Sequence, residues 1–396
     1  MKGLRELNIS ELKLKLSALS IYKNVIQKPV VKELHALVFC AGDRHEILKA
    51  CGALCFAAAA QGCLSDVAKA VSSGILYDEN PFSMGICEAD ELVRSDMEAL
   101  TALSQITPEE IAGRYEIRLS LLPKWGTKGF SVTPEELKVF YRKNGCGIYA
   151  RYAAFLWNGD ILPVTAPDRV TLQDLKGYAQ QRGDVLTNTK AFLAGLPANN
   201  ILLYGDRGTG KSSTVHAVLN EYRDEGLRIV EMPKRYLSDF PMLIDRLSGT
   251  ALKFIVFIDD LSFSQRDDSF SALKAVLEGG LSARPDNVLI YATSNRRHLV
   301  RETFSDRDGD ELHHSDTMQE VLSLSDRFGI TITFINPDRQ GYFDIVNKLA
   351  NDRGLMIDRT ELAERAERFA LSKGGRSPRV AKQLIDILTA EEKLKN

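Results

Sequence analysis

The stretch "NILLYGDRGTGKSS", residues 200–213, decides the fold of the second half of this chain. Within it, Gly205 to Ser212 match the pattern G-x-x-x-x-G-K-[ST] without departure. Glycines in such a loop let backbone N–H groups surround phosphate oxygens, and the positive end of the following helix adds to the attraction. The apolar "NILLY" before the loop predicts a strand, and "SSTVHAVLNEY" after it predicts a helix. The stretch therefore predicts a loop that binds nucleotide phosphates.

Two side chains of this loop have separate expected roles. Lys211 is expected to reach the β and γ phosphates, and the Ser212 hydroxyl is expected to ligate magnesium. Nucleotide binding is assigned to the whole loop, which comprises Gly205, Asp206, Arg207, Gly208, Thr209, Gly210, Lys211, Ser212 and Ser213.

A second nucleotide element is the apolar run "FIVFIDDLS", residues 254–262. A strand that ends in Asp259 places a carboxylate beside the magnesium, and Asp260 is then positioned to polarise an attacking water. Most strands of this kind end in Asp-Glu, whereas this one ends in Asp-Asp. The alternative for Asp260 is a residue that caps the following helix, because aspartate is a good cap.

The order of apolar and helical stretches predicts an α/β fold from residue 165 to residue 336. Continuous apolar strands belong in a parallel sheet that is covered on both faces. We expect five such strands: "NILLYG", "LRIVEM", "KFIVFIDD", "NVLIYATSN" and "ITITFI". Residues 337–396 are expected to form a helical subdomain, in which Asp358, three residues before Glu361, marks a helix start.

The first part of the chain, residues 1–150, is mostly helical by pattern. Leucines recur at helical spacing at Leu4, Leu7, Leu12, Leu16 and Leu19. Thr107 and Thr133 each precede a proline, with a glutamate three residues on, which predicts two capped helix starts. Residues 151–164 then predict a hairpin around Asn158-Gly159 and a domain boundary.

Composition limits the function classes. The chain has 396 residues, 44% of them hydrophobic, and a formal net charge of −2, which argues against wholesale attraction to nucleic acid or to a membrane. Cys51 and Cys55 share a helical face, but the close second pair of ligands that zinc needs is missing, so buried thiols are expected. The opening residues are too often charged for a secretory signal. We expect a reduced, cytoplasmic protein with no membrane partner.

Two other classes of phosphate-loop protein do not fit. Residues 347–350 imitate the guanine-reading pattern Asn-Lys-x-Asp, but Ala350 stands where the aspartate belongs. "LSGT" at 247–250 resembles the start of a transporter signature, but it lies too close to the next strand for the intervening helix. A GTPase is therefore not expected.

With these pieces in order, residues 165–396 resemble an AAA+ ATPase. The resemblance implies that "LQDLKGYAQQR", residues 172–182, packs beside the adenine. It implies that Asn295 of "YATSN" is the sensor-1 residue and that Arg327 of "LSDRFG" is an arginine finger reaching a neighbouring subunit. Arg379 of "GGRSPRVAKQL" matches the sensor-2 arginine, and Arg376 is a weaker substitute. The AAA+ resemblance also implies ATP as the nucleotide, with Mg²⁺, and self-association into a ring or an open oligomer.

Several stretches together resemble, more narrowly, the bacterial AAA+ family catalogued as domain of unknown function 815. They are "ANNILLYGDRGTGKSS", "DDLSF", "LKAVLEGGLSARPDNVLIYATSNRRHL" and "GGRSPR". Asp-Asp in place of Asp-Glu is expected to be a feature of this group. Ser264 departs from the acidic residue expected at its position.

Each carried-over arginine has a structural alternative. Arg327 could pair with Asp326 at the surface, and Arg379 could be a solvated helix residue. Arg296, Arg297 and His298 are interpreted as surface or interface charges. The acidic stretch 301–320, with His313-His314, is interpreted as a solvated loop rather than a metal site.

These residues together predict slow, assembly-dependent ATP hydrolysis that drives or gates remodelling of a protein client. Lys211, Asp260, Asn295 and Arg327 are the expected catalytic residues, and Ser212 and Asp259 are the expected metal ligands. One alternative is a nucleotide-gated scaffold that hydrolyses little.

Another alternative is a helper of nucleic-acid transactions. Basic residues alternate with aromatic ones between residues 124 and 151, a pattern that can touch phosphates and stack on bases. The preferred interpretation is an amphipathic helix with a solvated basic face and buried Phe140, Tyr141 and Tyr152, because acidic residues and the overall charge weaken the patch.

Overall fold

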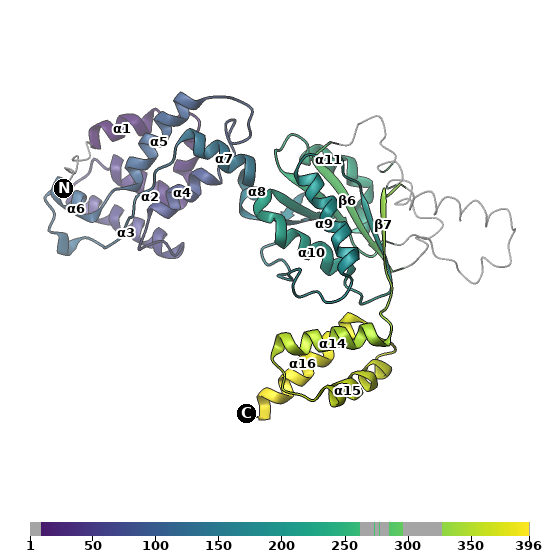
Figure 1. Cartoon of the computed structure of the whole chain (residues 1–396). Coiled ribbons are helices and arrows are strands. Elements are labelled where there is room, and N and C mark those ends of the chain that lie inside the picture. The colour runs from purple at the N-terminus through teal and green to yellow at the C-terminus, as the bar shows by residue number, and fades with distance from the viewer. Residues whose placement is uncertain (1–8, 262–272, 274–276, 278–284, 296–326, 396) are drawn as a thin grey trace. The chain divides into compact units, whose positions relative to one another are not determined.

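A computed structural model describes residues 9–261, 273, 277, 285–295 and 327–395 (Figure 1). The chain divides into two compact units, Met1–Arg151 and Tyr152–Asn396. Separate hydrophobic cores lie within these units.

Helices are the regular secondary structure of the first unit in its described residues, and loops connect them. Its α-helices are α1 (Ile9–Ser17), α2 (Pro29–Phe39), α3 (Arg44–Ala60), α4 (Ala68–Leu76), α5 (Asp90–Ser104), α6 (Pro108–Tyr115), α7 (Pro134–Asn144) and α8 (Gly147–Arg151). Two short 3₁₀ helices, η1 (Lys23–Gln27) and η2 (Leu119–Leu121), interrupt the loops. The predicted starts of α6 and α7 are confirmed, because Thr107 and Thr133 each form a complete capping box.

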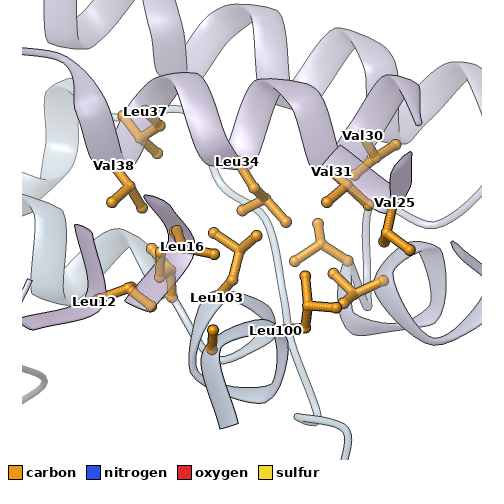
Figure 2. Close-up of a cluster of buried hydrophobic side chains, with 14 of the residues drawn as sticks. Leu12, Leu16, Val25, Val30, Val31, Leu34, Leu37, Val38, Leu100 and Leu103 are labelled. Carbon is orange, nitrogen blue, oxygen red and sulfur yellow. The ribbon is translucent and has the colours of Figure 1, made fainter. Parts of the chain in front are cut away.

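Apolar side chains of α1, α2 and α5 build the core of this unit (Figure 2). Leu12 and Leu16 of α1 are buried, as their spacing predicts, whereas Leu4 and Leu7 lie outside the described residues. Asp96 of α5 accepts hydrogen bonds from the backbone N–H groups of Ser20, Ile21 and Tyr22, and so ties the loop after α1 to this core. All six cysteines are free thiols, and Cys51 and Cys63 are buried.

The second unit is built on one sheet with helices on its faces. Its strands are β1 (Ala154–Trp157), β2 (Ile161–Pro163), β3 (Ile201–Gly205), β4 (Leu227–Glu231), β5 (Lys253–Ile258), β6 (Val288–Ser294) and β7 (Ile330–Phe334). Their order is β2-β1-β4-β5-β6-β3-β7, and every neighbouring pair except β1 and β2 is parallel. The strand order places β3, which leads into the phosphate loop, between β6 and β7.

The expectation of five strands is wrong, because the described residues alone contribute seven strands to the sheet. The five expected strands are all present, and the antiparallel hairpin around Asn158-Gly159 forms as predicted. The hairpin does not stand apart from the sheet, since Phe155 of β1 pairs with Val230 of β4. Phe155 and Trp157 are 1% and 0% exposed, and the Trp157 indole donates to Asp239 at 3.2 Å. Burial of these aromatic rings explains why the hairpin joins the sheet.

Two helices cover one face of the sheet: α9 (Ala179–Leu193) and α10 (Lys211–Tyr222). They pack on alternate strand residues such as Ile255 and Phe257 of β5. The residues between these, such as Val256, point to the opposite face and are also buried. Two-sided burial agrees with the uninterrupted apolar runs of the sequence. The remaining described helices of this part are η3 (Arg223–Glu225), η4 (Lys234–Asp239) and α11 (Phe240–Leu247).

Three helices form a small subdomain after β7, here called the lid. They are α14 (Arg339–Arg353), α15 (Arg359–Ser372) and α16 (Pro378–Lys395). The lid has its own apolar cluster, centred on Tyr342, Ala366 and Leu384. Asp358 accepts hydrogen bonds from the N–H groups of Thr360 and Glu361, so the predicted start of α15 is confirmed. No helix in the described parts of the chain is long and apolar enough to cross a membrane.

Candidate nucleotide-binding site

A cavity of about 570 Å³ lies in the second unit, bordered by the phosphate loop, the ends of β5 and β6, and the lid. The predicted loop residues Arg207 to Ser213 line it, together with Asp259, Asp260, Asn295 and Arg379. Gly205 and Asp206 are not among the lining residues. The structure therefore brings most of the predicted site residues to one cavity.

The phosphate loop needs glycine at two places where other chain segments come close. Gly205 has a φ of 131°, and a Cβ atom there would lie 2.0 Å from the carbonyl oxygen of Phe334 on β7. Gly208 has a φ of 80°, and a Cβ atom there would meet Ser377 Oγ at 3.0 Å. The Arg379 N–H donates to the Gly208 carbonyl at 3.1 Å. The loop is thus held between a strand of the sheet and the first turn of α16.

The carboxylate of Asp206 has a partner outside the cavity. It accepts a hydrogen bond of 2.6 Å from the backbone N–H of Asn336, and the Asp206 N–H donates to Phe334 O at 2.8 Å. The chain from Phe334 to Asn336 leads from β7 into the lid. Asp206 therefore connects the phosphate loop to the start of the lid, rather than presenting its side chain to a nucleotide.

Lys211 is almost fully buried at the base of the cavity, with 6% of its surface exposed. Its ammonium donates to the carbonyl groups of Gly205 at 2.9 Å and Asp206 at 2.7 Å, and to Asn295 Oδ1 at 3.0 Å. Burial lowers the pKa of this ammonium, while the nearby charges of Asp206, Asp259 and Asp260 act in the opposite direction. These hydrogen bonds hold the Lys211 ammonium beside Asn295, the predicted sensor-1 residue.

Asp259 and Ser212 meet as their predicted metal role requires. Ser212 Oγ donates to Asp259 Oδ1 at 2.6 Å, and Thr293 Oγ1 donates to the same oxygen at 2.5 Å. Carboxylate and hydroxyl oxygens are the hard ligands that Mg²⁺ accepts, usually one or two from the protein with the rest from water and phosphate. This oxygen cluster fits a magnesium ion bound together with a nucleotide.

Asp260 and Asn295 are in direct contact. Asn295 Nδ2 donates to Asp260 Oδ1 at 2.6 Å, and the Asp260 N–H donates to Thr293 Oγ1 at 2.9 Å. Asp260 has a left-handed backbone with a φ of 50°, a conformation that costs a non-glycine residue about 1–2 kcal/mol. The two hydrogen bonds hold it there. Residues 262–272, which follow this strand, are outside the described part, so the helix-capping alternative stays a prediction.

The two candidate sensor-2 arginines lie in different surroundings. The Arg379 side chain lines the cavity, as does Lys382 one turn later on α16. Arg376 does not line it, and its guanidinium forms an ion pair with Glu367. Lys382 was not predicted, although its spacing of three residues from Arg379 on a helix signals a shared face.

Part of the segment that was expected beside the adenine lines the cavity, and we call this part of the wall the base side. Asp174, Leu175 and Lys176 line the cavity together with Ile345 and Leu349 of α14. The Lys176 ammonium forms an ion pair of 2.5 Å with Asp352 of the same helix. The segment ahead of the phosphate loop is therefore tied to the lid.

Some predictions cannot be placed in this cavity. Arg327 is described just before β7 and does not line the cavity, so its role as a finger for a neighbouring subunit stays a prediction. Ser264, Arg296, Arg297, His298 and residues 301–320 lie outside the described residues, as does Asp326. Thr293 is a site residue that was not predicted, although it stands two positions before Asn295 and so shares its strand face.

The parallel sheet, the phosphate loop, the carboxylates at the end of β5 and the helical lid define a P-loop protein of the AAA+ type. The chain belongs to the family described as protein of unknown function (DUF815), whose model matches residues 150–392. The resemblance inferred from the sequence is thereby confirmed.

Two curated relatives match a shorter part. Over 115 residues the chain is 34% identical to the 26S proteasome regulatory subunit 4 homolog of Dictyostelium discoideum, covering 25% of this chain and 26% of that protein. Over 120 residues it is 32% identical to the homolog of the same name in Oryza sativa subsp. japonica, covering 26% and 27%. The chain thus spans about a quarter of the length of these relatives.

Proposed function

We propose that this protein binds ATP with Mg²⁺ and hydrolyses it slowly, in an assembly of several copies, to drive or gate the remodelling of a protein client. The observation that carries the proposal is the contact between Asn295 and Asp260 at 2.6 Å, beside Lys211 and the Ser212–Asp259 pair. These groups surround one cavity that has a phosphate loop on one side and a lid on the other. Two further proposals, a trans-acting Arg327 and a γ-phosphate contact by Arg379, rest on the AAA+ resemblance.

Each residue has a task in the proposed reaction. Lys211 neutralises charge on the γ-phosphoryl oxygens, and Asp260 with Asn295 orients a water molecule for in-line attack. Ser212 and Asp259 would hold magnesium, which supplies positive charge to the β and γ phosphates. Arg327 of a neighbouring copy stabilises the charge of the transition state.

Slow turnover is expected because Asp260 is one methylene shorter than glutamate. A misplacement of about 1 Å can lower a rate about a hundredfold. The left-handed backbone of Asp260 re-aims this shorter side chain toward Asn295, which supports a working carboxylate. The same hydrogen bond also supports a scaffold that binds ATP and hydrolyses little. It occupies one oxygen of the Asp260 carboxylate, which is then less available to polarise a water molecule.

The nucleic-acid alternative finds less support in the first unit. Tyr141 is 5% exposed, and its hydroxyl donates to Ile75 O at 2.7 Å, so its ring is not available for stacking on a base. Lys138 forms an ion pair of 2.7 Å with Asp90. Some aromatic and charged groups of the basic stretch therefore make contacts within the fold and are not available to a nucleic acid.

Phosphate release from ATP, measured across protein concentrations, tests the proposal. Turnover per chain is expected to rise with concentration in the wild type and to be lost in Asp260→Asn and Arg327→Ala. The control is Lys211→Ala, which lacks the phosphate-binding ammonium. Wild-type turnover no faster than that of this control, at concentrations where the chain assembles, would contradict hydrolysis. ATP binding without turnover would favour the scaffold.

A further inference from the structure

Arg182 lies in the first turn of α9 and lines the same cavity. It continues the sheet-facing stripe of that helix, since Val185, Thr189 and Phe192 follow at helical spacing and are at most 2% exposed. The start of α9 lies at the carboxyl end of β7, because the Tyr178 hydroxyl just before it donates to Ile335 O at 2.6 Å. Arg182 therefore stands over the sheet edge at which the phosphate loop begins.

The guanidinium of Arg182 has no counterion among the described residues. In the part of the chain that the structure describes, no carboxylate pairs with it, and burial alone lowers the pKa of this group. The nearest acidic residue of the cavity wall in sequence, Asp174, already accepts two hydrogen bonds of 2.7 Å from Thr171. By contrast, Lys176 and Arg376 on neighbouring segments are paired with acidic residues.

This placement is unfavourable for the protein alone. A partly buried cation without a partner loses hydration that no ion pair replaces. Its position in the first turn of a helix also sets it against the positive end of the helix dipole. A bound anion in the cavity offsets both effects, because it pairs with the guanidinium and is attracted to the positive end of the helix.

We propose that Arg182 binds the α-phosphate of the nucleotide, and this inference rests on the proposed ATP binding. The β and γ phosphates are served by Lys211 and by the Ser212 side of the loop. Arg182 lines the cavity together with Asp174 to Lys176 and with the phosphate loop. We therefore assign it to the portion of the nucleotide between the base and the β-phosphate. The α-phosphate is the only anionic group of that portion.

Binding of ATP, ADP, AMP and adenosine to the full chain tests the contact, by competition against a fluorescent ADP. Arg182→Gln is expected to weaken binding of the three phosphorylated ligands by a similar factor, about 10- to 100-fold, as for loss of a charge-assisted hydrogen bond. Adenosine binding is expected to stay unchanged. Arg182→Lys, which keeps the charge without the planar fork, is expected to retain most of the affinity.

The control is Lys190→Gln, which removes one positive charge from the exposed side of the same helix. Without nucleotide, the melting temperature of Arg182→Gln is expected to be no lower than that of this control, because the substitution removes an unpaired, partly buried charge. If Arg182→Gln does not fold, the test uses Arg182→Lys, which must still weaken the binding of AMP more than the binding of adenosine.

The outcomes for the two proposals differ. Wild-type protein that binds no ATP, or binds it as weakly as Lys211→Ala, overturns the proposed function itself. ATP binding that depends on Lys211 but is the same in Arg182→Gln overturns the α-phosphate contact alone. Equal losses for AMP and adenosine would also overturn it, because they would place Arg182 at the base or ribose.

Discussion

At the scale of single residues, Thr293 organises the candidate metal and water positions. Its hydroxyl donates to the Asp259 carboxylate and accepts from the Asp260 backbone N–H, so one side chain holds the carboxylate of one residue and the backbone of the next. It is 2% exposed, and buried polar groups of this kind need hydrogen-bond partners. The left-handed backbone at Asp260 depends on this support.

We predict that Thr293→Val lowers the free energy of unfolding by about 1–3 kcal/mol, because the Asp260 N–H loses its acceptor in a site of unchanged volume. The apparent affinity for Mg²⁺ in nucleotide binding is expected to fall as well, since Asp259 loses one of its two hydroxyl donors. Urea denaturation and magnesium titration measure the two effects. Thr293→Ser keeps the hydroxyl and is the control; equal behaviour of the valine and serine variants would contradict the prediction.

At the scale of elements, Asp206 joins the phosphate loop to the segment that leads into the lid. The bond from the Asn336 N–H is 2.6 Å long, and the Tyr178 hydroxyl binds the neighbouring carbonyl of Ile335. Residues before α9, the loop after β3 and the chain after β7 are thus linked at one place.

We expect Asp206→Ala to increase hydrogen exchange at the Asn336 amide and to lower the unfolding free energy by about 1–2 kcal/mol, because a carboxylate acceptor is removed. Exchange measured by mass spectrometry on peptides that span residues 334–340 tests this. Asp206→Asn retains an oxygen acceptor and is the matched control. Protection of the amide that is unchanged in the alanine variant would show that Asp206 does not hold the lid connection.

The elements that could be predicted are those whose signal is local. Thr107, Thr133 and Asp358 mark helix starts through contacts within three residues, and the phosphate loop carries its strand and helix beside it. The hairpin turn at Asn158-Gly159 is equally local. Its pairing with β4 is not, since residue 155 meets residue 230, and no local pattern specifies that partner.

The residues of the candidate site also divide into those that a local motif identifies and those that depend on the folded chain. Asp259, Asn295 and Arg379 each lie in a motif whose spacing identifies them. Lys382 reaches the cavity through helix orientation in the folded chain, and the sequence around it resembles any polar helix surface. Arg182 ends the segment 172–182 that was expected beside the adenine, but no role was predicted for its own side chain.

At the scale of the whole molecule, the chain consists of two compact units that meet at Arg151 and Tyr152 in the sequence. The hairpin belongs to the second unit, because β1 pairs with β4. The matched family model begins at residue 150, close to the same point. The hairpin is therefore part of the second unit and is not a spacer ahead of it.

We predict that a fragment of residues 152–396 folds and binds ATP, whereas a fragment of residues 165–396 is less stable by at least about 3–5 kcal/mol, the loss expected for one large buried aromatic side chain. Phe155 and Trp157 are both missing from the shorter fragment, and one edge of β4 loses its partner. Urea denaturation followed by circular dichroism compares the two. Equal midpoints would show that the hairpin adds nothing to the sheet.

The strand that ends the sheet at β2 has a consequence for solubility. It is three residues long, and its last residue, Pro163, has no backbone N–H to offer an incoming strand. Short, proline-bearing edges are a common protection against the edge-to-edge pairing that starts cross-β aggregates. Pairing of this edge with a strand from another copy is therefore disfavoured, because the incoming strand would lack one hydrogen-bond donor at this edge.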